Sequence, residues 1–127
     1  MPGRANAEAT LEFREPGRVV VYGIGKPKTV ELPEEVIEWL KKSIAARRVL
    51  EELVTHYKYR ARLSNPRALR SLILLLYSRA HGIPPYKTAR IYGVAPEQLY
   101  RMERGLRKDG LYEFVMDLLS LEETQNP

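Results

Sequence analysis

A long apolar run in the middle of the chain limits the possible folds more than any other feature. The run Leu72–Tyr77 lies within Arg67–His81 (RALRSLILLLYSRAH), with the break Ser64-Asn65-Pro66 before it and Gly82 after it. Asparagine before proline caps the start of a helix, and glycine commonly ends one. The run is much shorter than the roughly 20 apolar residues that a membrane span needs. The segment is therefore predicted to be a core helix.

Other elements are predicted on both sides of this helix. Arg18–Tyr22 and Lys28–Leu32 are rich in β-branched residues and flank a glycine-containing turn, so they predict a β-hairpin. Pro33 opens a helical pattern that continues to residue 62, as one long helix or as two helices that meet near Ala45-Ala46. Further helices are predicted from Pro84 to Gly93, from Pro96 to Lys108 and from Leu111 to Leu121.

These elements predict one mainly α-helical domain, with an N-terminal β-hairpin packed on a helical bundle. A chain of 127 residues, 44% of them hydrophobic, is long enough to bury such a core without disulfides or metals. The domain is expected to span residues 17–121, with the hairpin at 17–32, a long helix at 33–62, three helices at 66–108 and a C-terminal helix at 111–121. Residues 1–16 are expected to be a flexible arm and residues 122–127 a loose tail.

Charge is strongly segregated along the chain. Residues 1–40 carry five basic and seven acidic side chains, residues 41–108 carry sixteen and four, and residues 109–127 carry none and five. The middle segment therefore has a net charge of +12, whereas the whole chain has only +5. Such a charge asymmetry favours a polyanionic partner over the ordinary role of surface charge in solubility.

The segment Pro85–Arg104 (PYKTARIYGVAPEQLYRMER) has small and apolar residues at the spacing of two crossing helices. Ala89 is small where the helices would cross, Gly93 suits a left-handed turn, and Val94 follows as an apolar plug. The other core positions are expected to be Ile91, Tyr92, Leu99 and Met102. Together with the preceding apolar helix, the segment resembles the helix-turn-helix of DNA-binding proteins. Thr88 departs from that pattern, because an apolar residue is more usual there; the alternative is an ordinary helical hairpin.

The resemblance implies that Pro96–Lys108 is a recognition helix whose N-terminal half enters the major groove. Gln98 would pair with adenine and Arg101 with guanine, while the first helix would contact phosphates. The residues that the resemblance assigns to the interface are Tyr86, Lys87, Arg90, Gln98, Tyr100, Arg101, Arg104, Arg107 and Lys108. In the alternative interpretation, the arginines of the recognition helix form salt bridges with its own acids, Glu97 and Glu103.

A second basic segment lies just before the apolar helix and continues into its first turn. The residues that it adds to the candidate interface are Lys58, Tyr59, Arg60, Arg62, Arg67 and Arg70. Cations interleaved with Tyr57 and Tyr59 are typical of single-stranded nucleic acid sites, in which bases stack on rings and phosphates pair with cations. The same cations would serve a duplex backbone equally well. In the alternative interpretation, Tyr57 belongs to the core and the cations are simply solvated.

Residues with catalytic or metal-binding chemistry are few. The chain has no cysteine, and its two histidines, His56 and His81, lack the spacing of a metal-binding pair. No serine lies in a nucleophile-elbow motif. We therefore expect a protein that is not an enzyme and that uses no cofactor and no metal.

DNA is the expected partner. The helix-turn-helix resemblance favours a duplex, and the basic-aromatic segment favours a single strand. A protein-interaction module is the third possibility. A homodimer is expected, because helix-turn-helix dimers read half-sites about 34–36 Å apart; its seam would be Val36–Tyr57 or the C-terminal helix.

No apolar leader or membrane span is evident, which predicts a cytoplasmic, nucleoid-associated protein. Abundant arginine and glutamate with little asparagine, glutamine or cysteine indicate a thermophilic source.

Overall fold

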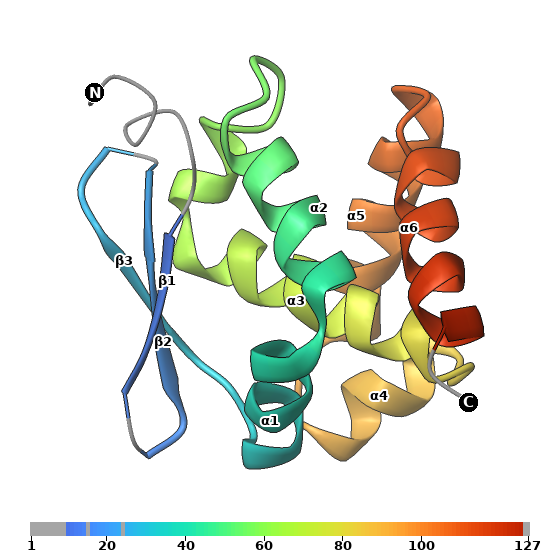
Figure 1. The fold of residues 1–127 in the computed structure, drawn as a ribbon, viewed down its shortest axis with the longest axis horizontal. Coiled ribbons are helices and arrows are strands. Elements are labelled where there is room, and N and C mark those ends of the chain that lie inside the picture. The colour runs from blue at the N-terminus through green and yellow to red at the C-terminus, as the bar shows by residue number, and fades with distance from the viewer. Residues whose placement is uncertain (1–9, 15, 24, 126–127) are drawn as a thin grey trace.

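The computed structural model describes residues 10–14, 16–23 and 25–125, and its fold is mainly α-helical with a small N-terminal sheet, as predicted (Figure 1). The sheet lies at one side of the helices, and α6 lies at the other side (Figure 1). The described elements are β1 (Thr10–Arg14), β2 (Arg18–Tyr22), β3 (Lys28–Glu31), α1 (Glu34–Lys42), α2 (Ile44–Val54), the 3₁₀ turn η2 (Arg62–Ser64), α3 (Pro66–Ala80), α4 (Pro85–Ile91), α5 (Pro96–Lys108) and α6 (Tyr112–Gln125).

Helix α3 forms the centre of the fold. The side-chain oxygen of Asn65 caps its start by accepting a hydrogen bond from the Arg67 backbone N–H at 2.8 Å. The middle of the helix is buried on all sides, with at most 2% exposure at Leu72, Ile73, Leu74, Leu75 and Leu76. A helix that is apolar all round must be covered by other elements, and here β3, α1, α4, α5 and α6 all contact it.

The sheet has three antiparallel strands, in the order β1-β2-β3, rather than the two strands of the predicted hairpin. The prediction of a flexible arm over 1–16 is therefore wrong for β1, while residues 1–9 and 15 lie outside the described part of the chain. Leu11 and Phe13 of β1 pack against the core, and the residues between and after them are exposed. This alternation is too short to be distinctive until a partner strand is known.

For 33–62 the single long helix is wrong and the alternative of two helices is correct, because the chain forms α1 and α2 with a break between them at Ser43, just before the expected meeting point at Ala45-Ala46. Ser43 has extended backbone angles (φ −87°, ψ 103°), and its hydroxyl oxygen accepts a hydrogen bond from the Ala46 backbone N–H at 3.0 Å. Serine is favoured at this capping position because it satisfies a free N–H group of the first helical turn. Helix α2 ends at Val54, and residues 55–61 form turns.

Helix α6 continues through Gln125, so the prediction of a loose tail from residue 122 is wrong for 122–125, while residues 126–127 lie outside the described part. The Glu122 carboxylate accepts hydrogen bonds from the Ser43 hydroxyl at 2.5 Å and from the backbone N–H groups of Ile44 and Ala45 at 2.8 and 3.2 Å. Free N–H groups and the helix dipole favour a carboxylate at a helix start. This one side chain joins the end of α6 to the start of α2.

Candidate nucleic-acid interface

Helices α4 and α5 are joined by a tight turn, at the residues that the sequence indicates. Gly93 in this turn has φ +69°, a left-handed conformation that strains any other residue. The Val94 backbone N–H donates to the Ala89 carbonyl at 2.9 Å, and the Val94 side chain packs against the core. Ala89 and Leu99 are fully buried, and Met102 is 1% exposed. These apolar positions pack α4 and α5 against each other and against α3.

Ile91 and Thr88 in α4 differ from the other positions of this helix pair. Ile91, an expected core position, is 65% exposed, because α4 ends there and Tyr92 takes the inward position against Tyr77. Thr88 is fully buried, and its hydroxyl accepts a hydrogen bond from the Ser78 hydroxyl in α3. Because buried hydroxyls need partners, this pair explains how a polar residue is accommodated at the crossing.

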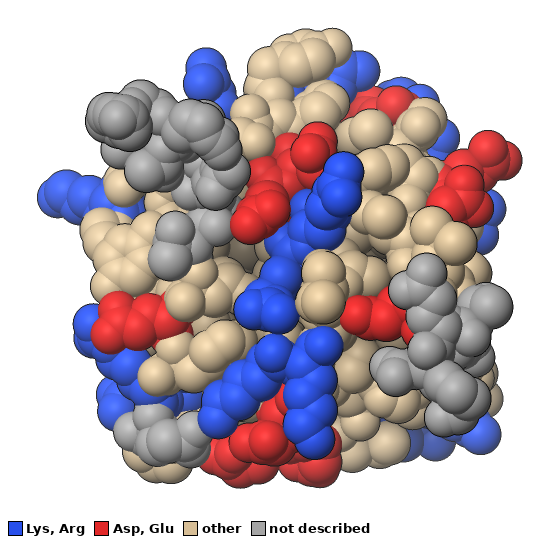
Figure 2. Space-filling model, in the orientation of Figure 1, with Lys and Arg blue, Asp and Glu red and all other residues tan. Residues whose placement is uncertain are grey.

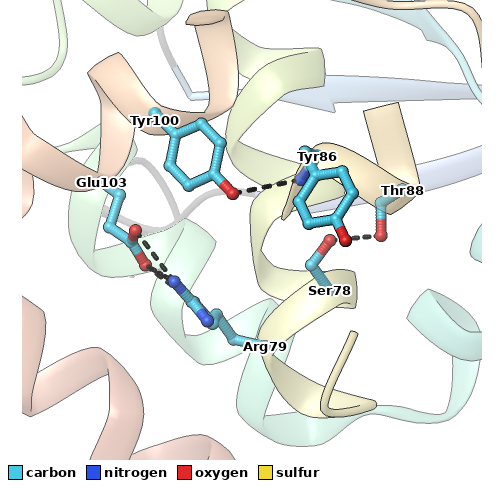
Figure 3. A network of polar contacts seen from close by, with 6 residues as sticks. All are labelled: Ser78, Arg79, Tyr86, Thr88, Tyr100 and Glu103. Carbon is cyan, nitrogen blue, oxygen red and sulfur yellow. Dashed lines mark hydrogen bonds and ion pairs between the residues drawn. The ribbon is translucent and has the colours of Figure 1, made fainter. Parts of the chain in front are cut away.

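A polar network fixes the rotation of α5 about its own axis (Figure 3). The Arg79 guanidinium in α3 donates to both carboxylate oxygens of Glu103, at 2.7 and 2.9 Å, and Glu103 is only 5% exposed. Burial raises the pKa of Glu103, but the hydrogen bonds and positive charge of Arg79 outweigh burial and hold this pKa below its usual value. Nearby, the Tyr86 backbone N–H donates to the Tyr100 hydroxyl at 3.3 Å. The opposite side of α5 is consequently turned to solvent.

The solvent-facing side of α5 carries Glu97, Arg101, Arg104 and Lys108, which recur at helical spacing and are all exposed. Salt bridging between Glu103 and the arginines of α5 does not occur, because Glu103 faces Arg79 instead. Arg101 and Arg104 make no ion pair with any residue that the structure describes. Their guanidinium groups are therefore available to an anionic partner.

Two adjoining hollows lie between α5 and the segment from Ala61 to Ser71. One has a volume of about 420 Å³, the other has about 660 Å³, and both are lined by Arg62 and Arg101. We call the pair the α5 groove. Its charged lining consists of Arg62, Arg67, Arg101, Arg104, Arg107, Lys108 and Asp109. Asp109 is engaged by Lys58 at 3.4 Å and by the Tyr59 hydroxyl at 2.8 Å, so the groove has a strong positive excess.

A second basic cluster lies on α4, which packs against α5. Its exposed members are Tyr86, Lys87 and Arg90. The Arg90 guanidinium lies 5.8 Å from the centre of the Tyr86 ring, which holds the two side chains near each other. Tyr100, predicted to point outward, is half-buried between α5 and α4 and contacts the backbone of α4. Basic side chains therefore flank α5 on the α4 side as well as in the α5 groove.

Tyr59, expected to stack on bases, lies in the core and is 1% exposed. Burial, and then the hydrogen bond that its hydroxyl donates to Asp109, raise the pKa of Tyr59. A ring enclosed in this way has no free face for a base, so we withdraw the stacking role from Tyr59. Tyr57, which the alternative interpretation assigns to the core, is instead 75% exposed and stacks on His56.

The remaining candidates, Lys58, Arg60 and Arg70, do not line the α5 groove. Lys58 and Arg60 are exposed on the turns between α2 and η2. Arg70 is half-buried, and its Nε donates to the Glu31 carbonyl at 3.0 Å, in a separate hollow of about 430 Å³ that Arg18 also lines. The groove also includes Asn65, which caps α3, and Ser71 in its second turn; sequence reasoning missed both because a single polar residue carries no binding signal of its own.

The comparisons with protein-family models, curated proteins and solved structures found no match to this chain. Among the residues that the structure describes, no helix is long and apolar enough to cross a membrane, and no cluster of histidine, aspartate and glutamate could hold a metal ion.

The face formed by α1, α2 and α6 has a different charge pattern from the α5 groove. In Figure 2, basic side chains cross the centre of this face over α1 and α2, and acidic side chains lie below them and to both sides. The described basic residues of α1 and α2 are Lys41, Lys42, Arg47 and Arg48. Because opposite charges are interspersed here, this face offers a weaker site for a polyanion than the α5 groove does.

Proposed function

We propose that this protein binds double-stranded DNA, with α5 as the helix that enters the major groove. The observation that carries the proposal is the outer face of α5, where Arg101, Arg104 and Lys108 project without an ion pair to any described residue. Such a row of free cations on a rigid helix is suited to phosphates and to the acceptor atoms of guanine.

The basic clusters on two sides of α5 support a duplex as the partner. A helix with side chains is about 10–12 Å in diameter, and the major groove of B-DNA is about 12 Å wide. A helix in this groove has a phosphate backbone on each side. In this chain, α4 brings Lys87 and Arg90 to one side of α5, whereas Arg62 and Arg67 lie in the groove on another side. Phosphate contacts from both clusters would set the position of α5 on the duplex.

Base reading is assigned to the N-terminal half of α5. Gln98 is exposed there, and its amide oxygen is 3.4 Å from the Ser71 hydroxyl, which holds the side chain at the mouth of the groove. Arg101 lies about one turn further along the helix and lines both hollows. We expect Gln98 to read adenine and Arg101 to read guanine.

The test is a titration of a fluorescent duplex over a range of salt concentrations. Micromolar binding at low salt, which weakens steeply as salt rises, is expected because phosphate contacts release counterions. The double variant Arg101→Ala/Arg104→Ala should lose most of this binding, whereas Arg47→Ala/Arg48→Ala on α2 removes the same charge and should retain it. Equal losses in the two variants would show that total charge, rather than α5, controls binding.

Single-stranded nucleic acid is a second candidate partner, and the exposure of Tyr57 favours it. A tyrosine that is 75% exposed next to Lys58 and Arg60 offers a ring and cations to an unpaired strand. Competition between the labelled duplex and unlabelled oligo-dT distinguishes the two candidates. Displacement by oligo-dT at concentrations that match the duplex would favour the single strand.

We further propose that the protein acts as a homodimer through α6. Both expected seams, Val36–Tyr57 and the C-terminal helix, place most of their apolar side chains inside the molecule, and the large exposed exceptions are Ile44, Tyr57 and Leu121. On α6, Leu121 is 59% exposed, close to Ile44, which is 69% exposed and whose N–H contacts the adjacent Glu122. Sedimentation equilibrium should give twice the 14.7 kDa chain mass, and Leu121→Glu should reduce it to one chain. A single-chain mass for the parent at high micromolar concentration would refute the dimer.

A further inference from the structure

Three aromatic rings form a column that leads from the core to the surface in the turns after α2. Tyr59 is the inner ring, with its hydroxyl bound to Asp109. His56 packs against it edge to face, with ring centres 5.8 Å apart and 72° between the planes. Tyr57 is the outer ring and stacks on His56, with centres 4.8 Å apart and 21° between the planes. Three quarters of the Tyr57 residue remains exposed.

The column is held in place before any ligand arrives. The Lys58 backbone N–H donates to Nδ1 of His56 at 3.1 Å, which fixes the orientation of the imidazole ring. The buried Tyr59 fixes the inner end, because its ring is enclosed by the core. A site that is already ordered loses little conformational entropy on binding, so an exposed ring mounted on this column is a suitable binding surface.

The column adjoins one end of the α5 groove. The Lys58 ammonium lies 3.4 Å from Asp109, which lines the groove at the end of α5. The Arg62 guanidinium is 6.0 Å from the centre of the Tyr59 ring, and Arg62 itself lines both hollows. Figure 1 shows the turns after α2 and the junction of α5 and α6 at the same end of the molecule. A strand that leaves the groove at this end therefore meets Tyr57.

Cations that could pair with the phosphate of a nucleotide lie beside Tyr57. The Lys58 ammonium lies 6.0 Å from the centre of the Tyr57 ring, and Arg60 is exposed on the same turns. A nucleobase stacked on an aromatic ring places its phosphate a short distance to the side, where a cation can pair with it. Bases inside a duplex are already stacked on each other, so only an unpaired base can use the ring.

We propose that Tyr57 is a stacking site for an unpaired nucleobase, so that the preferred ligand is a DNA duplex that continues into a single strand. The inference rests on the proposed duplex binding for the part of the ligand that occupies the α5 groove. The ring of Tyr57 contacts the base, Arg60 pairs with its phosphate, and Lys58 joins it by turning from Asp109 to the phosphate. His56 and Tyr59 position Tyr57. This role accounts for the exposed ring of Tyr57, which takes no part in the proposed contacts between α5 and the duplex.

The experiment compares three labelled ligands: a blunt duplex, the same duplex with an oligo-dT extension of about ten nucleotides, and the oligo-dT alone. The parent protein should bind the extended duplex roughly 5- to 150-fold more tightly than the blunt duplex, the range that corresponds to one stacked base. Tyr57→Leu, which keeps an apolar side chain but removes the ring, should abolish this advantage. Tyr57→Phe keeps the ring and should retain the advantage. Blunt-duplex affinity should be the same in all three proteins.

A fluorescent base analogue gives a second measurement. The fluorescence of 2-aminopurine, placed in the extension next to the duplex, should be quenched by the parent and by Tyr57→Phe but not by Tyr57→Leu. The stacking proposal is overturned if Tyr57→Leu changes neither the advantage of the extended duplex nor the affinity for oligo-dT. If the proposed duplex binding is wrong, the result is different. The blunt duplex would then not bind, while the affinity for oligo-dT would still fall in Tyr57→Leu.

Discussion

In the proposed interface, base recognition by α5 would depend chiefly on Arg101. It lines both hollows of the α5 groove, and its guanidinium has no acidic partner among the described residues. A bidentate contact to guanine is planar, so neither lysine nor a shorter cation can reproduce it.

Replacing Arg101 with alanine should weaken binding to a preferred duplex by about 1–3 kcal/mol and relax selectivity at one base pair. The melting temperature should stay close to that of the parent, because the side chain is exposed. Selection from a randomised duplex pool, followed by titration of the best sequences, measures both effects. Arg48→Ala, an equivalent loss of charge on α2, should leave the selected sequence unchanged. Unaltered selectivity in Arg101→Ala would remove Arg101 from base reading.

Glu103 makes the stability of the α5 packing dependent on pH. Glu103→Gln should lower the free energy of unfolding by about 1.5–3 kcal/mol at pH 7, because a charge-assisted hydrogen-bonded pair is lost. The folded-state pKa of Glu103 is below its usual value of 4.5, so the stabilisation is complete above about pH 4.5 and is lost as pH falls through that lower value. Denaturant titrations at several pH values should show the difference shrinking in acid. Glu97→Gln, at an exposed acid of the same helix, should show little difference at any pH.

Some residue roles could be predicted from the sequence and others could not. The spacing of Ala89, Leu99 and Met102 was enough to place them in the core, because helical periodicity determines which residues share a face. The same reasoning fails for Tyr57 and Tyr59, because it allows a buried Tyr57 and an exposed Tyr59, whereas the structure has the reverse. Residues 55–61 form turns, and turns have no fixed period from which burial can be predicted. The hydroxyl of the buried Tyr59 finds its hydrogen-bond acceptor in Asp109, which lies 50 residues away. No local pattern contains that contact.

At the scale of elements, the predictions for α3, α4 and α5 are close to the structure, because proline and glycine mark their ends. The break between α1 and α2 has no such marker. The sequence therefore allows either one helix or two helices that meet near Ala45-Ala46, and what stabilises the break at Ser43 is the carboxylate of Glu122 in α6. The strand β1 was missed for a similar reason, since its pairing with β2 is the stabilising factor.

Removing the cap of α2 should loosen two helices together. Ser43→Ala should destabilise the protein by about 0.5–2 kcal/mol, the usual cost of a lost N-terminal cap. Glu122→Ala should in addition speed hydrogen exchange at the amides of Ile44 and Ala45, which it leaves without their acceptor. Exchange followed by NMR reports both sites, with Glu113→Ala as the matched change on α6. Unchanged protection in Glu122→Ala would mean that the carboxylate does not hold these amides in solution.

At the scale of the whole molecule, the sequence predicts a positive middle segment, and the fold gathers part of it into the α5 groove. Lys87 on α4 contributes one further charge outside that groove. Lys87→Ala should therefore weaken binding to all duplexes alike and reduce the slope of log affinity against log salt by about one unit. Lys42→Ala on α1 should leave the slope as it is. A sequence-dependent loss in Lys87→Ala would place this side chain at a base instead of a phosphate.

The carboxylate of Glu122 also has a consequence for the order in which the protein forms. It is 79 residues further along the chain than Ser43, which it caps. At about 5–20 residues per second, a ribosome needs roughly 4–16 s to add the intervening chain. During that interval, a nascent chain can assemble the sheet, α1 and α3 while the amide groups at the start of α2 still face water. The N-terminal cap of α2 is therefore completed only after α6 has been synthesised.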